Sequence, residues 1–192
     1  MRIILASKSP RRKELLSTLF DDFECIPSLK EEKVSKKVGY KKLAELLSEQ
    51  KAEDIYNQTT DDRLIIGSDT MVICSGKIFG KPKDENDAFN MLKSLSGKTH
   101  LVVTGLCVIK YENGKKEKLI TNVVTKVTFN QLTDKEISDY VKTNEPMDKA
   151  GAYGCQGVGK KFISNIYGDF FAVMGLPVSK TYEFCKQLNV LQ

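Results

Sequence analysis

Apolar residues recur along the chain in two periods, one typical of strands and one typical of amphipathic helices. The apolar run over residues 2–6 predicts a strand. The Ser9-Pro10 pair that follows predicts the N-cap and first position of a helix that extends to about residue 19. Four more helices are expected: from about residue 38, from Asp84 to Gly97, from the capping box at Thr133 to about residue 142, and from Pro177.

Strand-like segments separate these helices. The segment over residues 63–74 is rich in β-formers and is broken in its middle by Gly-Ser-Asp-Thr, at residues 67–70. Two long β-rich runs flank Asn113-Gly114, and because Asn-Gly supplies the positive φ angles of a type I′ turn, we expect an antiparallel hairpin there. Two further strands are expected over residues 162–166 and 170–174.

The order of these elements predicts one α/β domain over residues 1–192, with two lobes around a cleft. A chain of this length can bury roughly 70% of its unfolded surface and needs no disulfide or metal staple. No apolar run approaches the roughly 20 residues that a membrane-spanning helix needs. The basic residues that closely follow the first apolar run also argue against a signal peptide. We therefore expect a cytoplasmic protein.

Composition narrows the chemistry that the chain can perform. The five cysteines include no C-x-x-C pair, which predicts reduced thiols, most of them in the core. His100 is the only histidine, so we expect it to be structural, and a zinc hydrolase or a Ser-His-Asp triad is a poor fit. Any hydrolytic chemistry is therefore expected to rest on carboxylates, basic side chains and a hard metal ion. A net charge of +5 without an aromatic and basic stripe favours a mononucleotide over stable nucleic-acid binding.

A cluster of basic residues starts the first predicted helix. With Ser9 as the N-cap, Arg11, Arg12 and Lys13 occupy the first turn, where the helix dipole is positive and acidic residues are normally preferred. An anion held by backbone N–H groups, the hydroxyls of Ser7 and Ser9 and two guanidiniums would explain this placement. The sequence therefore favours a phosphate site, with arginines that face solvent as the alternative.

Asp69 lies inside an apolar, β-rich run, where an ionised carboxylate without a partner is costly. We expect it to face a cation, which could be a metal ion, a lysine or an arginine. Oxygen ligands favour Mg²⁺ or Mn²⁺, and Mg²⁺ typically takes one or two carboxylates together with substrate phosphates. The alternative is an aspartate in a turn between two strands.

Two further motifs are weaker. Lys81 lies in Gly-Lys-Pro, downstream of Asp69, and is a candidate phosphate ligand. Residues 154–160 fit G-x-x-x-x-G-K, but Lys161 stands where a P-loop needs Ser or Thr, so a P-loop is rejected. The glycines from 151 to 159 would instead shape a loop that approaches a ligand, with the amide of Gln156 able to read a base edge.

Five blocks of the sequence, in order along the whole chain, resemble the Maf family of nucleoside triphosphate pyrophosphatases. They lie at residues 5–16, 67–70, 80–100, 145–157 and 173–177. The resemblance implies an elongated α/β fold with a mixed sheet, similar to the inosine triphosphate pyrophosphatases, and a deep cleft between two lobes. It also implies a homodimer and Mg²⁺- or Mn²⁺-dependent cleavage of a nucleoside triphosphate to the monophosphate and pyrophosphate.

The resemblance also assigns roles to individual residues. The catalytic aspartate of the family falls on Asp69, and its acidic metal ligand falls on Glu32, with Glu31 as the alternative. Its two catalytic lysines fall on Lys51 and Lys81. The residues implied in substrate binding are Ser9, Arg11, Arg12, Thr70 and Gln156.

At Arg12, Thr70 and Gln156 the sequence resembles the subgroup of the family that prefers dTTP and UTP. The mechanism implied is attack of a metal-assisted water on the α-phosphorus, with Asp69 as base, as metal ligand or as both. Two rival functions remain compatible with the sequence. One is a non-catalytic nucleotide-binding regulator linked to cell division control, and the other is a basic nucleic-acid-binding protein.

Overall fold

The computed structural model describes residues 1–30 and 38–192, and the chain divides into two compact units. Unit 1 comprises Met1–Asp69, Thr104–Val123 and Gly175–Gln192. Unit 2 comprises Thr70–Val103 and Val124–Met174. The boundary between them crosses three strands, so that Asp69 and Thr70 are neighbours in one strand but belong to different units.

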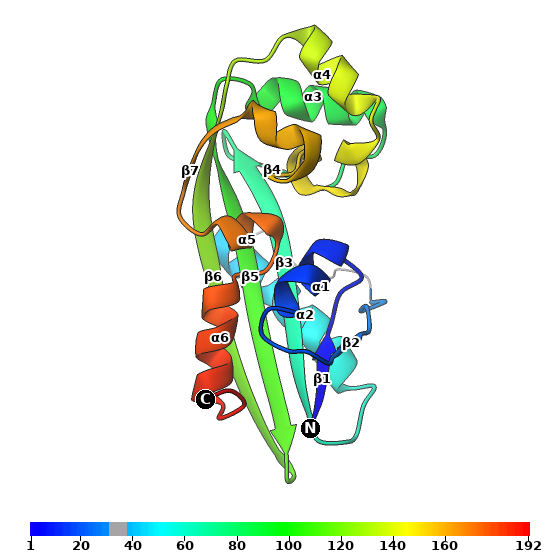
Figure 1. Cartoon of the computed structure of the whole chain (residues 1–192), viewed down its shortest axis with the longest axis vertical. Helices are drawn as coiled ribbons and strands as arrows, with labels where there is room; N and C mark the ends of the chain where they lie inside the picture. The colour runs from blue at the N-terminus through cyan, green and yellow to red at the C-terminus, as the bar shows by residue number, and fades with distance from the viewer. Residues whose placement is uncertain (31–37) are drawn as a thin grey trace. The chain divides into compact units, whose positions relative to one another are not determined.

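The described residues form a mixed seven-stranded sheet in the order β2-β1-β3-β5-β6-β7, with β4 paired to β3 (Figure 1). The β1 strand pairs in parallel with both β2 and β3, whereas β4 on β3 and β7 on β6 are antiparallel. The mixed α/β class expected from the sequence is confirmed. The strands are β1 (Arg2–Leu5), β2 (Glu24–Cys25), β3 (Arg63–Cys74), β4 (Lys77–Phe79), β5 (Thr99–Glu112), β6 (Lys115–Phe129) and β7 (Ile163–Tyr167).

In unit 1, helices cover both faces of the sheet: α1 (Pro10–Leu16), α2 (Tyr40–Tyr56) and α6 (Val178–Gln187). The Ser9 side chain caps α1 as predicted, accepting the Arg12 backbone N–H at 3.5 Å. The α1 helix ends at Leu16 and not near residue 19. At this end, the hydroxyls of Ser17 and Thr18 each donate to a backbone carbonyl of the last turn at 2.7 Å.

The β3 strand is continuous, so the predicted break at residues 67–70 is wrong. Two local features explain the continuity. Gly67 has no side chain to collide with α2, and the buried Ser68 hydroxyl bridges the carbonyl oxygens of Gly105 and Gly175 at 2.9 and 2.8 Å. Polar residues that signal a turn in the sequence are therefore satisfied inside the sheet. Asp69 lies in a strand and not in a turn.

Unit 2 holds α3 (Glu85–Leu95), α4 (Asp134–Val141), α5 (Phe170–Met174) and the 3₁₀ turns η1 (Glu145–Asp148), η2 (Ala150–Ala152) and η3 (Gly157–Phe162). The predicted caps of the first two helices are present. Asp84 accepts the Asp87 N–H at 2.7 Å, and Thr133 and Glu136 form a reciprocal capping box. An aromatic and aliphatic core lies beneath them, including Leu92, Leu95, Phe129, Tyr140 and Phe162.

The segment over residues 170–174 is the short helix α5, so the strand predicted there is wrong. Asp169 initiates the helix by accepting the Ala172 N–H at 3.0 Å, and the Thr125 hydroxyl fixes both the N–H and the carbonyl of Asp169. A five-residue apolar run fits either structure, and here the contact with Thr125, distant in sequence, is one that the pattern could not indicate.

Three other predictions are confirmed. Asn113 and Gly114 have φ angles of 52° and 77°, as a type I′ hairpin requires. All five cysteines are free thiols, and burial raises the pKa of Cys107 and Cys185 to about 12. His100 is a core residue that shares a hydrogen bond of 2.7 Å with the Tyr153 hydroxyl. No helix in the described part of the chain is long and apolar enough to cross a membrane.

Candidate functional site

Asp69 and Lys51 form an ion pair inside unit 1. Asp69 extends from β3 and Lys51 from α2, and their side chains are only 13% and 21% exposed. The pair shows that a lysine, one of the cations that the sequence allowed, faces this partly buried carboxylate. It also brings together two residues that the resemblance made catalytic.

The Lys51–Asp69 contact depends on a close approach of α2 to the sheet. A Cβ atom at Gly67 would lie 2.4 Å from the Ser48 carbonyl oxygen, and one at Gly105 would lie 2.0 Å from that of Ala44. The neighbouring strands β3 and β5 thus have no side chain at the positions where they approach α2 most closely. Because alternate strand residues share a face, Gly67 and Asp69 both face α2, and the glycine lets the helix come near enough for Lys51 to reach the carboxylate.

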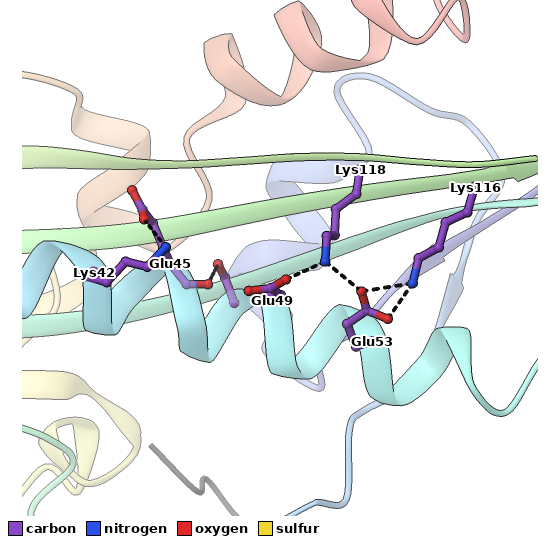
Figure 2. Close-up of polar contacts among 7 residues, drawn as sticks. Lys42, Glu45, Glu49, Glu53, Lys116 and Lys118 are labelled. Carbon is purple, nitrogen blue, oxygen red and sulfur yellow. Dashed lines mark hydrogen bonds and ion pairs between the residues drawn. The ribbon is translucent and has the colours of Figure 1, made fainter. Parts of the chain in front are cut away.

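A ladder of charges fixes the other flank of α2 (Figure 2). Glu53 accepts from Lys116 at 2.7 and 2.9 Å and from Lys118 at 3.0 Å, and Glu49 also pairs with Lys118. Both lysines come from β6. Successive helix residues are about 100° apart, so the glutamates and Lys51 lie on opposite flanks of the face that packs on the sheet. The ladder therefore opposes rotation of α2 about its own axis.

At the start of α1 the structure brings together residues of the predicted phosphate site, and anion binding there stays a prediction. No acidic residue occupies the first turn. The Arg12 side chain is held at two points, since Nε donates to the Gly175 carbonyl at 2.8 Å and Nη1 donates to the Ser7 hydroxyl at 3.3 Å. Ser9 caps the same turn, and its N–H donates to the Ser7 hydroxyl at 3.2 Å. Arg11 lies beside Arg12 on α1 and is half-buried.

In unit 2, the structure joins the two motifs that the sequence treated separately. The Gly151 N–H donates to the Gly80 carbonyl at 2.9 Å, so the segment that carries Lys81 is bonded to the start of the glycine-rich segment. Gly151 has a φ of 70°, and a Cβ atom there would lie 2.9 Å from the Val72 side chain. Thr70 lies in β3, and Gln156 immediately precedes η3.

Comparison with known proteins identifies the family. The model of the family described as "Maf-like protein" matches residues 2–188. The chain belongs to the Maf family. A curated Maf relative from Aquifex aeolicus, named dTTP/UTP pyrophosphatase, is 48% identical, covering 100% of this chain and 97% of its own. A protein of the same name from Clostridium novyi is 44% identical and covers 99% of both chains.

One solved structure is also similar at low level. The nucleoside-triphosphatase/dITP/XTP pyrophosphatase from Mycobacterium abscessus covers 97% of this chain and 95% of its own, with 13% identity and a TM-score of 0.42. That likeness is too low to support an argument. The family assignment rests on the sequence comparisons.

For this Maf protein, the predicted metal ligand Glu32 and its alternative Glu31 lie outside the described residues. The chain just before them is anchored by Asp54 of α2, which accepts from the Ser28 hydroxyl at 2.7 Å and pairs with Lys30 at 3.2 Å. Burial raises the pKa of Asp54, but these bonds, with others from Gln58 and Leu29, outweigh it and bring the pKa below its ordinary value. The buried carboxylate is thus charged and paired at neutral pH.

Several residues that contact or support the candidate site residues were missed by the sequence reasoning. The Gly175 carbonyl accepts from both Arg12 and Ser68, although the block containing Gly175 served only to identify the family. Glu49 and Glu53 belong to a series of glutamates spaced four residues apart on α2. That spacing was a usable signal, because it places them on one helix face.

Proposed function

We propose that this chain is a nucleoside triphosphate pyrophosphatase that hydrolyses dTTP, UTP and modified pyrimidine triphosphates to the monophosphate and pyrophosphate. The observation that carries the proposal is the partly buried Lys51–Asp69 pair, in a chain that is 44–48% identical to relatives named dTTP/UTP pyrophosphatase. Asp69 is fixed in a strand, and Lys51 is fixed on a helix that packs closely on the sheet. Stabilisation of a charged transition state requires groups that are held in place in this way.

The proposed roles follow from the chemistry of each side chain. Asp69 orients or deprotonates the water that attacks the α-phosphorus. Lys51 stabilises the negative charge that develops on the phosphoryl oxygens. Ser9, Arg11 and Arg12 bind the phosphates at the start of α1, where backbone N–H groups and two guanidiniums favour an anion.

The unit 2 residues complete the proposed assignment. Lys81 is a second catalytic lysine that neutralises charge on the leaving pyrophosphate. Thr70 and Gln156 contribute to recognition of the pyrimidine base, for which the amide of Gln156 offers both a donor and an acceptor. The Gly80–Gly151 bond supports this assignment, because it ties the Lys81 segment to the segment that leads to Gln156.

A divalent metal ion, Mg²⁺ or Mn²⁺, is part of the proposal. Among residues 1–30 and 38–192 no group of three candidate metal ligands occurs. Asp69 alone still fits the mode in which Mg²⁺ binds one or two carboxylates and completes its shell with substrate phosphates, and Glu32 is the proposed second ligand. When bound, the ion would neutralise phosphate charge and acidify water.

We further propose a cytoplasmic homodimer that does not bind nucleic acid stably. The homodimer rests on the family resemblance. The absence of stable nucleic-acid binding rests on the modest net charge of +5.

The function is tested by pyrophosphate release from dTTP, UTP and GTP with Mg²⁺ or Mn²⁺. We expect turnover of the pyrimidine nucleotides, and a fall of about 1,000-fold or more in Asp69→Asn, because the variant loses both the charge and the base. Asp22→Asn, at an exposed carboxylate of the same unit, is the matched control and should leave turnover unchanged.

Undiminished turnover in Asp69→Asn would contradict the assignment of Asp69. Binding of dTTP by the wild-type protein with no product formed would contradict the enzymatic function altogether. That second result would instead favour the non-catalytic regulator linked to cell division control.

A further inference from the structure

A half-buried carboxylate in unit 2 binds a loop. Glu145 is the first residue of η1, and its side chain accepts three hydrogen bonds. The Tyr140 hydroxyl donates at 2.9 Å, the Val158 N–H at 2.9 Å and the Gly159 N–H at 3.2 Å. The first donor comes from α4 and the other two from η3, so Glu145 links the helix to the loop over residues 154–159, here called the glycine loop.

The glycine loop is packed against this carboxylate at distances that only glycine permits. A Cβ atom at Gly157 would lie 2.8 Å from a carboxylate oxygen of Glu145, and Gly157 has a φ of 69°. A Cβ atom at Gly159 would lie 2.6 Å from the Tyr140 hydroxyl oxygen. Two glycines that the sequence marked as a ligand-approaching loop therefore have a second use, which is to let the loop close on Glu145 and Tyr140.

The charge of Glu145 is stabilised where it stands. Burial raises its pKa, but the two backbone N–H groups, the Tyr140 hydroxyl and the charge of Lys149 outweigh burial and bring the pKa below its ordinary value. The Lys149 ammonium donates to the backbone carbonyl of Glu145 at 2.5 Å. Near neutral pH the loop is thus bonded to an ionised carboxylate, which makes stronger hydrogen bonds than a neutral group.

Gln156 directly precedes the three residues that Glu145 holds. Its backbone position is set by Gly157, Val158 and Gly159, of which the last two bond to the carboxylate and the first packs against it. We propose that Glu145 is a positioning residue for base selection, which fixes the glycine loop so that the Gln156 amide meets the pyrimidine. This inference rests on the proposed function and deepens it.

Glu145→Gln tests the inference with little change of shape. The variant keeps one oxygen, but its amide nitrogen cannot accept from a backbone N–H, so at least one loop bond is lost and two donors face each other. Glu136→Gln is the matched control. Glu136 is also a carboxylate of unit 2 that accepts a backbone N–H, at 2.8 Å from Thr133, but it caps α4 and does not contact the glycine loop in the described hydrogen bonds.

The measurement is kcat and KM for dTTP, UTP and GTP. We expect Glu145→Gln to lower the ratio of kcat/KM for dTTP over GTP by about tenfold or more, through KM, since a 1 Å misplacement of a contact can cost about 100-fold. The kcat for dTTP should stay within about twofold, and Glu136→Gln should keep the wild-type ratio. Tyr140→Phe removes one bond to Glu145 and also the hydrogen bond between the Tyr140 hydroxyl and the Gly154 backbone. This second variant keeps both backbone bonds to Glu145, so it should shift the ratio in the same direction by a smaller factor.

An unchanged ratio in Glu145→Gln, or an equal shift in Glu136→Gln, would overturn the inference. If Glu145→Gln does not fold, as judged by thermal melting, an unchanged ratio in Tyr140→Phe would overturn it. These results are distinct from failure of the proposed function, which would appear as a wild-type protein that does not release pyrophosphate from dTTP.

Discussion

Gly105→Ala tests whether the seating of α2 controls catalysis. The added Cβ would lie 2.0 Å from the Ala44 carbonyl oxygen and 3.0 Å from the Glu45 backbone nitrogen, whereas ordinary contact begins near 3.4 Å. Both neighbours are helix backbone, which cannot rotate out of the way as a long side chain can. The helix must therefore move away from β5 by more than 1 Å, or the strand must yield by a similar distance.

The expected cost has two parts. Overpacking of this kind destabilises a protein by about 1–3 kcal/mol. Lys51 lies two turns further along the same helix, so a rigid displacement of α2 would carry it away from Asp69. A misplacement of about 1 Å at a reacting centre can lower the rate about 100-fold. We therefore expect kcat for dTTP to fall by about 10- to 100-fold in protein that remains folded.

The assay is turnover at a temperature well below the melting transition, with urea unfolding to measure stability. Gly39→Ala is the matched control. Gly39 is the N-cap of the same helix, with a φ of −62° and no atom within 4 Å of an added Cβ. It should change kcat by less than about twofold and stability by about 0.5 kcal/mol or less. A folded Gly105→Ala variant with wild-type kcat would refute the argument that the close packing of α2 on Gly105 positions Lys51.

Two further predictions concern stability. Burial lowers the pKa of His100 to about 4 from its ordinary value of 6.5, so the unfolded chain takes up that proton first and stability falls as the pH drops from about 6.5 to 4. By linkage this group should cost about 2 kcal/mol between pH 7 and pH 5, and urea unfolding of His100→Gln should lack that loss. Glu53→Gln should cost about 1 kcal/mol, because Lys116 and Lys118 lose a partly buried partner. Asp139→Asn, in the exposed pair with Lys135, should cost clearly less. Equal losses in these two carboxylate variants would contradict a stabilising ladder, and a pH dependence retained in His100→Gln would contradict the assignment to His100.

The sequence was most informative where a residue type conflicts with the preference of its local structure. Arginines in the first turn of α1 contradict the helix dipole, and a carboxylate in an apolar strand contradicts burial, so both could be recognised without a structure. In the structure Asp69 pairs with Lys51, and Arg12 is bonded to the Gly175 carbonyl. Anion binding by Arg12 stays a prediction. Such conflicts are detectable because the preferences that they violate are local.

The errors and omissions share a different cause, which is contact between distant segments. The local sequence at Gly67 and Ser68 predicts a strand break. The strand is continuous because Gly67 packs against α2 and the Ser68 hydroxyl bonds to the Gly105 carbonyl, and both partners are distant in sequence. The helix at residues 170–174 depends on Thr125, about 45 residues earlier in the chain. The link between the Lys81 and Gln156 motifs is one backbone bond between Gly80 and Gly151. No local pattern encodes these pairings.

The most direct test of the central claim is the fate of oxygen from water during dTTP hydrolysis. When the reaction is run in H₂¹⁸O, attack at the α-phosphorus predicts one ¹⁸O atom in the nucleoside monophosphate and none in pyrophosphate, measured by mass spectrometry after partial turnover. Label in the pyrophosphate, or release of orthophosphate as the first product, would contradict the account.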